Sequence, residues 1–367
     1  MPMTPDRLAA AFIRFGQVEC PEDPLYSAIC GIVGNEPELL QLLSAAPPEQ
    51  RRPNLWLAAL HDRVLDGVAH PLREYYASVG GTRAPDAALA DTLRDFARRE
   101  APALRQCMQT HRTQTNEIGR CAVLWPSLQA VAERQQATRL ALLDVGCSAG
   151  LNLGVDRYRY DYGEFSAGAE AGPGVPQIAC RLLGVGRPPC AGSSPWQIVQ
   201  RLGIDPAPVD VNDDVAVRWL RACIWPSDPA RFTRFAQAVT LARQQRWPVR
   251  QQADCTAAIA AWLDSVPDGV LPVIFNSWVL AYFEPDPLRH HIDTVVQAVR
   301  ERGAVWLCAE GSDIRVGPIE MPPAAAPPSD ASTPPSLWTL CSRAGSDVRF
   351  DLLVRSHPHG RWMEWCG

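Results

Sequence analysis

The 367-residue chain has 47% apolar side chains, enough for the core of one large domain or of a domain with a sizeable extension. Its 35 cationic and 40 acidic residues give a net charge of −5 and are interspersed, which argues against general binding of nucleic acid through phosphates. The sequence contains no lysine, so every one of these cationic residues is an arginine. Schiff-base chemistry, a lysine general base and a P-loop lysine are thereby excluded.

The beginning of the chain, residues 1–16, mixes charged residues into its apolar ones, and no stretch of about 18 apolar residues occurs. We therefore expect a cytoplasmic protein that does not enter a membrane. The 12 cysteines form no Cys-x-x-Cys pair and no tight cluster with histidine. In the absence of a secretion signal, this pattern predicts reduced thiols and no metal site.

The first third of the sequence has helical periodicity. Thr4-Pro5-Asp6 is typical of a helix start. Apolar residues then recur at helical spacing within residues 8–15, 39–43, 55–64 and 89–96. This pattern predicts an all-helical domain or cap over residues 1–136.

The pattern changes at residue 140. Residues 140–145 form a nearly continuous apolar run, which suits a parallel strand buried on both faces, and the small-residue turn 146–150 follows. Predicted helices at 197–202, 230–243 and 287–302 then alternate with predicted strands at 203–206, 249–253, 270–276 and 304–309. The alternation predicts an α/β fold for residues 137–367, with a mostly parallel, Rossmann-like sheet.

Further segments complete the expected fold. Residues 337–341 and 348–355 predict an antiparallel C-terminal hairpin that closes one edge of the sheet. Stretches rich in glycine and proline near 163–194 and 321–335 interrupt the alternation and are interpreted as surface insertions.

The turn after the first strand reads Leu143-Asp-Val-Gly-Cys-Ser-Ala-Gly150, with an acid at the strand end and small residues where the chain turns. Its spacing resembles the first motif of class I S-adenosylmethionine-dependent methyltransferases, acid-x-Gly-x-Gly-x-Gly, with a serine in place of the central glycine. Such a turn lets backbone approach a ligand closely and leaves N–H groups free to bind it. The resemblance implies that the cofactor is bound by Asp144, Gly146, Cys147, Ser148, Gly150 and Asn152.

Two other interpretations of this turn remain open. Gly-x-Ser-x-Gly is also the nucleophile elbow of α/β-hydrolases, with Ser148 as the nucleophile. Hydrolases build several strands and an oxyanion loop before the elbow, whereas the preceding residues here are predicted to be helical. A turn without any ligand is the second alternative, but it leaves Asp144 unexplained, because a carboxylate at a buried strand end needs partners.

Acids also follow the later strands. Asp205 is placed like the second-strand acid that binds ribose hydroxyls, but it lies 59 residues after Gly146, well beyond the usual gap of about 20. Asp161 is the alternative acid. Asp254, followed by Cys255, stands where methyltransferases commonly bind the adenine amino group, although a lone aspartate at this place is equally a helix cap.

The segment Val273–Phe283 resembles the fourth-strand motif of the same enzymes, whose end faces both methyl donor and acceptor. Asn276 is expected to contact the cofactor and Ser277 to orient the acceptor. Trp278 and Tyr282 are expected to line the acceptor pocket, with ordinary core packing as the alternative.

Four polar residues crowd the segment just before the predicted sheet, and we expect them to line the acceptor pocket: Gln114, Asn116, Glu117 and Arg120. The alternative is a capping box at a solvated helix start. An acceptor that needs a general base could use Glu117, His111 or Tyr282, judged from position alone.

Taken together, residues 139–309 resemble the class I methyltransferase core. Nearly the whole chain resembles an uncharacterised bacterial domain-of-unknown-function family with this core. The segments that resemble it are Asp23–Tyr26, Gln114–Arg120, Gly150–Tyr158, Arg218–Pro226 and Phe275–Phe283.

The resemblance implies methyl transfer from S-adenosylmethionine to a small molecule. The rival functions are a non-catalytic protein that binds S-adenosylmethionine or another nucleotide, and a serine hydrolase. A nicotinamide oxidoreductase is disfavoured, because the turn lacks Gly-x-Gly-x-x-Gly.

Overall fold

The structure is a computed structural model that describes residues 4–20, 22–114, 116–189, 195–321, 324 and 334–367. The chain forms two compact units, each with its own hydrophobic core. Unit 1 comprises Met1–Thr115 and Asn212–Thr233, and unit 2 comprises Asn116–Val211 and Arg234–Gly367. Residues 116–136, expected from the sequence in the N-terminal domain, belong to the unit that contains the sheet. Within the described part of the chain, no helix is long and apolar enough to cross a membrane.

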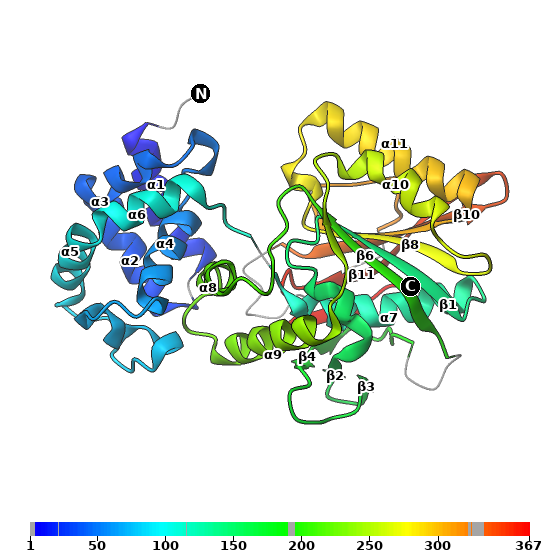
Figure 1. The fold of residues 1–367 in the computed structure, drawn as a ribbon, viewed down its shortest axis with the longest axis horizontal. Coiled ribbons are helices and arrows are strands. Elements are labelled where there is room, and N and C mark those ends of the chain that lie inside the picture. Colours follow the sequence, from blue (N-terminus) through cyan, green and yellow to red (C-terminus); the bar gives the residue numbers. More distant parts are fainter. Residues whose placement is uncertain (1–3, 21, 115, 190–194, 322–323, 325–333) are drawn as a thin grey trace. The chain divides into compact units, whose positions relative to one another are not determined.

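Unit 1 is built from helices (Figure 1). Thr4 caps the first helix as its sequence predicts, accepting a hydrogen bond from Arg7 N at 3.4 Å. Proline stands in the first turn of several of these helices, where its missing N–H group leaves no hydrogen bond unmade. The α-helices of this unit are α1 (Pro5–Arg14), α2 (Pro24–Asn35), α3 (Pro37–Gln41), α4 (Pro53–Leu65), α5 (Leu89–Arg99), α6 (Ala101–Thr110) and α8 (Asp214–Ala222), and α9 (Pro229–Gln245) starts here and ends in unit 2.

Residues 212–233 complete the core of unit 1 although they are distant in sequence from its other helices. The ring centroid of Trp225 lies 6.4 Å from that of Tyr26. Asp23 is fully buried, and it caps α2 by accepting a hydrogen bond from Tyr26 N at 2.9 Å. Its second oxygen accepts a hydrogen bond from Ser227 Oγ at 2.8 Å. Two of the segments that resemble the bacterial family therefore meet in this core.

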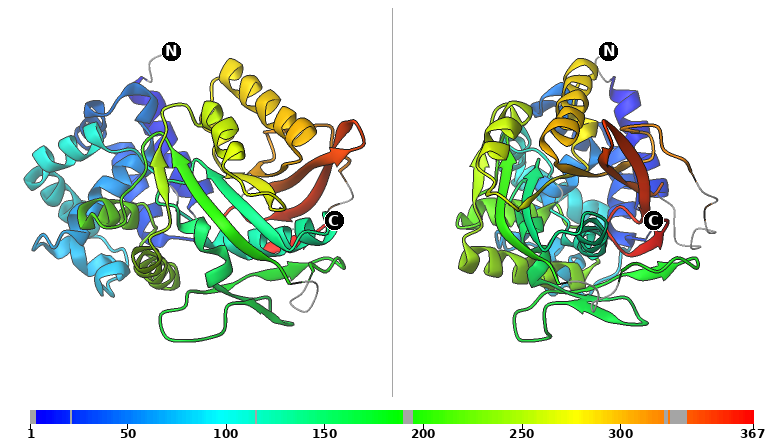
Figure 2. Two further views of the ribbon diagram at one scale, coloured as in Figure 1. Left: turned by 45° about the vertical axis from the view of Figure 1, so that its right-hand side comes forward. Right: turned by 90° about the vertical axis from the view of Figure 1, so that its right-hand side faces the viewer.

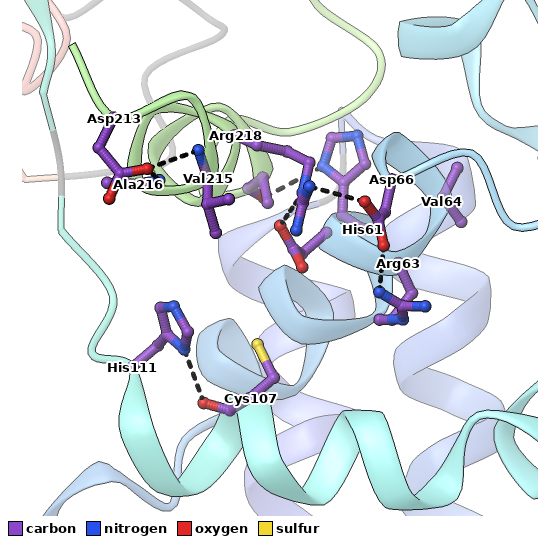
Figure 3. Close-up of polar contacts among 12 residues, drawn as sticks. His61, Arg63, Val64, Asp66, Cys107, His111, Asp213, Val215, Ala216 and Arg218 are labelled. Carbon is purple, nitrogen blue, oxygen red and sulfur yellow. Dashed lines mark hydrogen bonds and ion pairs between the residues drawn. The ribbon is translucent and has the colours of Figure 1, made fainter. Parts of the chain in front are cut away.

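Arg218 holds α8 to α4 (Figure 3). Its Nε donates to Asp62 Oδ1 at 2.9 Å, and its Nη1 lies 2.6 Å from Asp66 Oδ1. His61 Nδ1 on α4 lies 3.1 Å from the carbonyl oxygen of Ala222 on α8, and burial lowers the pKa of His61 to about 3, which keeps the ring neutral. Since Asp62 is only 7% exposed, the guanidinium replaces hydration that this carboxylate has lost.

The described residues of unit 2 form a nine-stranded sheet of order β5-β12-β11-β10-β9-β8-β1-β6-β7. The five strands β7, β6, β1, β8 and β9 are parallel neighbours, and β10, β11 and β12 continue the sheet antiparallel, so the predicted C-terminal hairpin is confirmed. The strands are β1 (Arg139–Val145), β5 (Arg181–Leu183), β6 (Gln197–Asp205), β7 (Val249–Gln251), β8 (Leu271–Ser277), β9 (Val305–Gly311), β10 (Ser336–Ala344), β11 (Asp347–Ser356) and β12 (Trp362–Trp365).

Helices cover both faces of this sheet (Figure 1, Figure 2). Helices α10 (Cys255–Asp264) and α11 (Pro285–Arg302) lie on one face, and α7 (Cys121–Arg134) lies on the other. Strand β1 is buried from its second residue to its last, as its apolar run predicts for a parallel strand covered on both faces. Leu143 and Val145 point to the same face and share one apolar cluster with residues of α10 and α11.

The prediction of a helix at 197–202 is wrong, because these residues form the first part of β6. Ile198 and Leu202 have the four-residue spacing of a helix face, but hydrogen bonding beside β1 overrides this short pattern. The other predicted elements of the alternation at 230–243, 249–253, 270–276, 287–302 and 304–309 correspond to α9, β7, β8, α11 and β9.

The first predicted insertion contributes strands. A small sheet of order β3-β2-β4 consists of β2 (Arg159–Asp161), β3 (Ser166–Gly168) and β4 (Gln177–Ala179), and β5 pairs with β12 in the main sheet. The expectation that the hairpin closes the sheet edge is therefore wrong, since β12 and β5 extend the sheet beyond β11. Residues 190–194 of this insertion, and 322–323 and 325–333 of the second one, lie outside the described residues.

Replacing Arg218 by methionine keeps an unbranched stem but removes both ion pairs with α4. We expect the free energy of unfolding to fall by about 1–3 kcal/mol, because Asp62 stays buried without this cation, as measured by urea denaturation followed by far-UV circular dichroism. Arg94→Met is the control, because Arg94 is 45% exposed where it pairs with Glu36 and Asp91, and exposed ion pairs contribute about 1 kcal/mol or less. Equal losses in the two variants would contradict the role given to Arg218.

Candidate functional site

The order of the parallel strands reverses next to β1. The chain passes from β1 outward to β6 and β7, then returns to β8 on the other side of β1 and continues outward to β9. The carboxyl ends meet at one edge, where Val145 pairs with Ile204 and Asn276, and Asn276 pairs with Cys308. In open α/β sheets, ligands bind outside the carboxyl ends at such a reversal. Polar residues just beyond these ends therefore form the candidate site.

The turn after β1 has three residues in the left-handed region, Gly146 (φ 71°), Ser148 (φ 51°) and Gly150 (φ 68°). Ser148 is not a glycine, so its conformation is strained and has to be held by its surroundings. The start of the turn is fixed to β6, because Gly146 N and Cys147 N both donate to the carbonyl oxygen of Ile204, at 2.8 and 3.2 Å.

Side chains of the protein itself explain the two glycines. A Cβ atom at Gly146 would lie 2.5 Å from Val279 Cγ2, and one at Gly150 would lie 2.5 Å from Val249 Cγ2. Packing and backbone conformation are thus sufficient reasons for glycine at both positions. The glycine spacing alone does not identify a ligand, and the polar side chains of the site have to do so.

Asp205 and Asn116 hold Ser148 in place. Asp205 Oδ2 accepts a hydrogen bond from Ser148 N at 2.8 Å, and its Oδ1 accepts one from Ala207 N at 2.8 Å. Asn116 Nδ2 donates to Ser148 Oγ at 2.7 Å, and its Oδ1 accepts from Ala149 N at 3.1 Å. Both residues therefore stabilise the strained turn.

Asp161, the alternative to Asp205, lies on β2 of the small sheet. It is exposed, and its Oδ1 accepts a hydrogen bond from Gly163 N at 2.9 Å. Of the two acids, Asp205 is the one that lies beside the turn.

Asp144 is the most unusual residue of the site. It is 1% exposed, and its Oδ2 has no hydrogen-bond partner among the described residues. Burial, and secondarily the negative charge of Asp205, raise the pKa of Asp144 to about 8, against the opposing effects of a hydrogen bond from Asn152 and the charge of Arg120. Asp144 is therefore mostly protonated at neutral pH and offers one buried oxygen to a partner that the described residues do not supply.

Glu310, at the end of β9, has a similar environment. It is 2% exposed, and its Oε1 accepts hydrogen bonds from Asn276 Nδ2 at 2.7 Å, Val279 N at 2.9 Å and Leu280 N at 3.2 Å. Its Oε2 has no partner within the described ranges, and burial raises the pKa of its carboxyl group. Trp306 Nε1 donates to Asn276 Oδ1 at 2.6 Å, so both ends of the Asn276 amide are engaged. Asn276 thus orients Glu310, and its expected contact with the cofactor stays a prediction.

Sequence reasoning missed Glu310, although a signal for it exists. Asp144 and Glu310 both stand near the end of a buried apolar strand, with a glycine one or two residues later. The same argument that singled out Asp144, a carboxylate at a buried strand end, applies to Glu310.

Arg120 brings positive charge to the site. It is 6% exposed, its Nε donates to the carbonyl oxygen of Pro358 at 2.8 Å, and its Nη1 donates to Ser277 Oγ at 3.2 Å. Its guanidinium carbon lies 5.8 Å from the centre of the Trp278 ring. The charge of Arg120 lowers the pKa of both Asp144 and Glu310, so this single guanidinium acts on both buried acids.

Trp278 is half-buried and has φ 58°, a second strained residue at this edge. Glu117 is buried and its Oε1 accepts a hydrogen bond from Gly119 N at 2.8 Å, which caps the short helix Ile118–Arg120. The cap expected as the alternative for this segment is thus present.

The other expected residues are more dispersed. Asp254 caps α10 by accepting hydrogen bonds from Thr256 N and Ala257 N at 2.9 and 3.0 Å, and burial raises the pKa of Cys255 to about 11. Tyr282 is 71% exposed.

Gln114 and His111 belong to unit 1. There the His111 ring packs 4.5 Å from that of Trp219. Among the described residues, no group of three His, Cys, Asp or Glu side chains could hold a metal ion.

The raised pKa of Asp144 predicts a stability that falls as pH rises. Between the ordinary value of 3.8 and about 8, the folded chain holds a proton that the unfolded chain releases. Relative to Asp144→Asn, the free energy of unfolding of the wild type should fall by up to about 1.4 kcal/mol per pH unit in this window. Urea denaturation of both proteins at about pH 5, 6.5 and 8 measures the difference.

Asp254→Asn is the matched control, because asparagine also caps helices well. Its stability should follow the same pH dependence as that of the wild type. A constant difference between the wild type and Asp144→Asn across the three pH values would contradict a protonated Asp144.

One family model matches residues 9–365, nearly the whole chain. No curated protein matches the sequence. The description of the matching family, "Uncharacterized protein conserved in bacteria (DUF2332)", names no activity. The resemblance to a bacterial family that five segments of the sequence indicate is therefore confirmed: the chain belongs to DUF2332.

Proposed function

We propose that this protein binds S-adenosylmethionine at the carboxyl ends of β1 and β8 and transfers its methyl group to a small molecule. The observation on which the proposal depends is Asp144. A buried carboxyl oxygen without a partner costs several kcal/mol unless a ligand supplies the missing donor. The amino group of the methionine part of this cofactor is such a donor.

The strand order supports a nucleotide-binding role. Numbered by their sequence order, the five parallel strands are arranged 3-2-1-4-5, as in the Rossmann sheet. The strained turn at Ser148 and the acid Asp205 lie where such a sheet binds its ligand.

The residues present fit this cofactor in part. Among the residues that the structure describes, Asp144 has one oxygen without a hydrogen-bond partner, whereas both oxygens of Asp205 already accept hydrogen bonds from backbone N–H groups. Each of these oxygens has a second lone pair, so Asp205 can still accept from a ribose hydroxyl. When bound, S-adenosylmethionine supplies a methyl group activated by the sulfonium. The protein then has to align the acceptor and exclude water, and it needs little acid–base machinery.

A serine hydrolase is the weaker alternative. Ser148 has the left-handed backbone that suits a nucleophile elbow. However, the amide nitrogen of Asn116 donates to its hydroxyl oxygen, and an amide cannot take up the serine proton as a general base.

Calorimetric titration with S-adenosylmethionine, S-adenosylhomocysteine and NADH tests the proposal. We expect both sulfur nucleotides to bind the wild type with micromolar affinity and NADH not to bind. Asp144→Ala should weaken binding at least tenfold, because it removes the carboxyl group that accepts a hydrogen bond from the amino group of the ligand. The matched control Asp161→Ala, at an exposed acid outside the strand-order reversal, should bind like the wild type. Absence of binding to both sulfur nucleotides would contradict the proposal.

Labelling with a fluorophosphonate probe separates the hydrolase alternative. A serine that is activated as a nucleophile forms a stable adduct with such a probe, and mass spectrometry locates it. We expect no adduct at Ser148. An adduct there that is absent from Ser148→Ala would favour the hydrolase.

A further inference from the structure

We infer that the methyl acceptor is an amine and that Glu310 binds it as its ammonium ion. Glu310 takes up one proton of this ion, so that the neutral nitrogen forms the new bond to the methyl carbon while the carbon–sulfur bond breaks and S-adenosylhomocysteine leaves. Glu310 then releases the proton to solvent. The inference rests on the proposed methyltransferase function. It assigns Asp144 to the cofactor, which is the methyl donor, and Glu310 to the methyl acceptor. Strand β8 lies between β1, which carries Asp144, and β9, which carries Glu310.

The orientation of Glu310 is set before any ligand arrives. Three donors hold Oε1, namely the Asn276 amide and the N–H groups of Val279 and Leu280. Asn276 is itself fixed by the indole of Trp306. If Glu310 served only to fix the loop after β8, its second oxygen would not have to be buried with no partner among the described residues. A site whose residues are already oriented loses little entropy when its ligand binds.

Glu310 lies close to the turn after β1. The loop that donates to its Oε1 packs Val279 against Gly146, at the turn where the cofactor is proposed to bind. The Trp278 ring lies beside the next residue along β9, because a Cβ atom on Gly311 would be 3.6 Å from Trp278 Cη2. Glu310 is therefore bordered by the half-buried aromatic residue that the sequence predicts in the acceptor pocket.

The chemistry of the free oxygen favours a cation over a neutral donor. A hydrogen bond from an ionised donor to a carboxylate is about twice as strong as one between neutral groups. A buried carboxylate also gains most from a partner of opposite charge, because removing it from water is costly. Burial raises the pKa of Glu310, and an ammonium group would stabilise its ionised form.

Sinefungin tests this inference, because it resembles S-adenosylmethionine but has an ammonium-bearing carbon in place of the methylated sulfur. Calorimetry compares it with S-adenosylhomocysteine, which has no group at this position. We expect the wild type to bind sinefungin at least tenfold more tightly. In Glu310→Gln this preference should fall to less than threefold, while the affinity for S-adenosylhomocysteine stays within threefold of the wild type.

Two controls accompany this comparison. Glutamine keeps an oxygen for the three donors, and thermal denaturation verifies that Glu310→Gln is folded. Asp264→Asn replaces an exposed acid on α10 and should leave both affinities unchanged.

The outcomes separate the two proposals. If S-adenosylhomocysteine binds the wild type but sinefungin binds no more tightly, the role of Glu310 is wrong and the methyltransferase proposal stands; this comparison needs no variant. A preference that persists in folded Glu310→Gln overturns the role of Glu310 as well. If neither ligand binds, the cofactor site itself is wrong, and the inference fails with it.

Discussion

The candidate site in unit 2 is shaped by the free-energy cost of burying carboxyl groups at the ends of parallel strands. A strand covered on both faces has no water near its side chains, so an acid within it must be neutralised, hydrogen-bonded or paired. At one edge of this sheet, Asp205 is hydrogen-bonded, whereas Asp144 and Glu310 each keep one oxygen without a partner in the described part of the chain. Packing alone would favour apolar residues at both positions, so these two acids are the strongest indication of a ligand.

The polar network around these acids shows how the site is kept in shape without a ligand. Asn116 and Asp205 hold the strained Ser148, and Asn276 holds Glu310. Several residues that the sequence indicates as ligand contacts therefore serve to position others. Residues that fix the geometry of a site need not contact its ligand themselves, so motif residues and ligand-contacting residues need not coincide.

Unit 1 differs from unit 2 in the interactions that hold it together. Its core is apolar, and the segment that completes it comes from about a hundred residues further along the chain. The polar contacts that hold this segment include the ion pairs of Arg218 with α4, the contact of His61 with the carbonyl oxygen of Ala222, and the hydrogen bond between Asp23 and Ser227. Residues 23–26 and 218–226, which resemble the bacterial family, thus lie in unit 1, whereas Gly150–Tyr158 and Phe275–Phe283 lie in unit 2 and the segment Gln114–Arg120 falls across the boundary between the units.

Local pattern was sufficient for much of the fold. The helical periodicity of the first third, the buried first strand with its turn, the alternation after residue 230 and the C-terminal hairpin could all be predicted, because each depends on burial along one short segment. Asp144 could be singled out for the same reason, since an acid in an apolar run is unusual whatever its neighbours are. The family resemblance was likewise visible in short segments.

Only the tertiary structure decided the rest, because it depends on partners distant in the chain. Residues 197–202 form a strand because their backbone pairs with that of β1, and β5 extends the sheet because it pairs with β12. Glu310 is a candidate site residue because Asn276 and the loop after β8 bind one of its oxygens, while the other has no partner in the described ranges. Sequence by itself determined which segments are apolar and where the acids stand; the three-dimensional contacts determined which of these acids are satisfied, and an unsatisfied buried acid is what indicates a ligand.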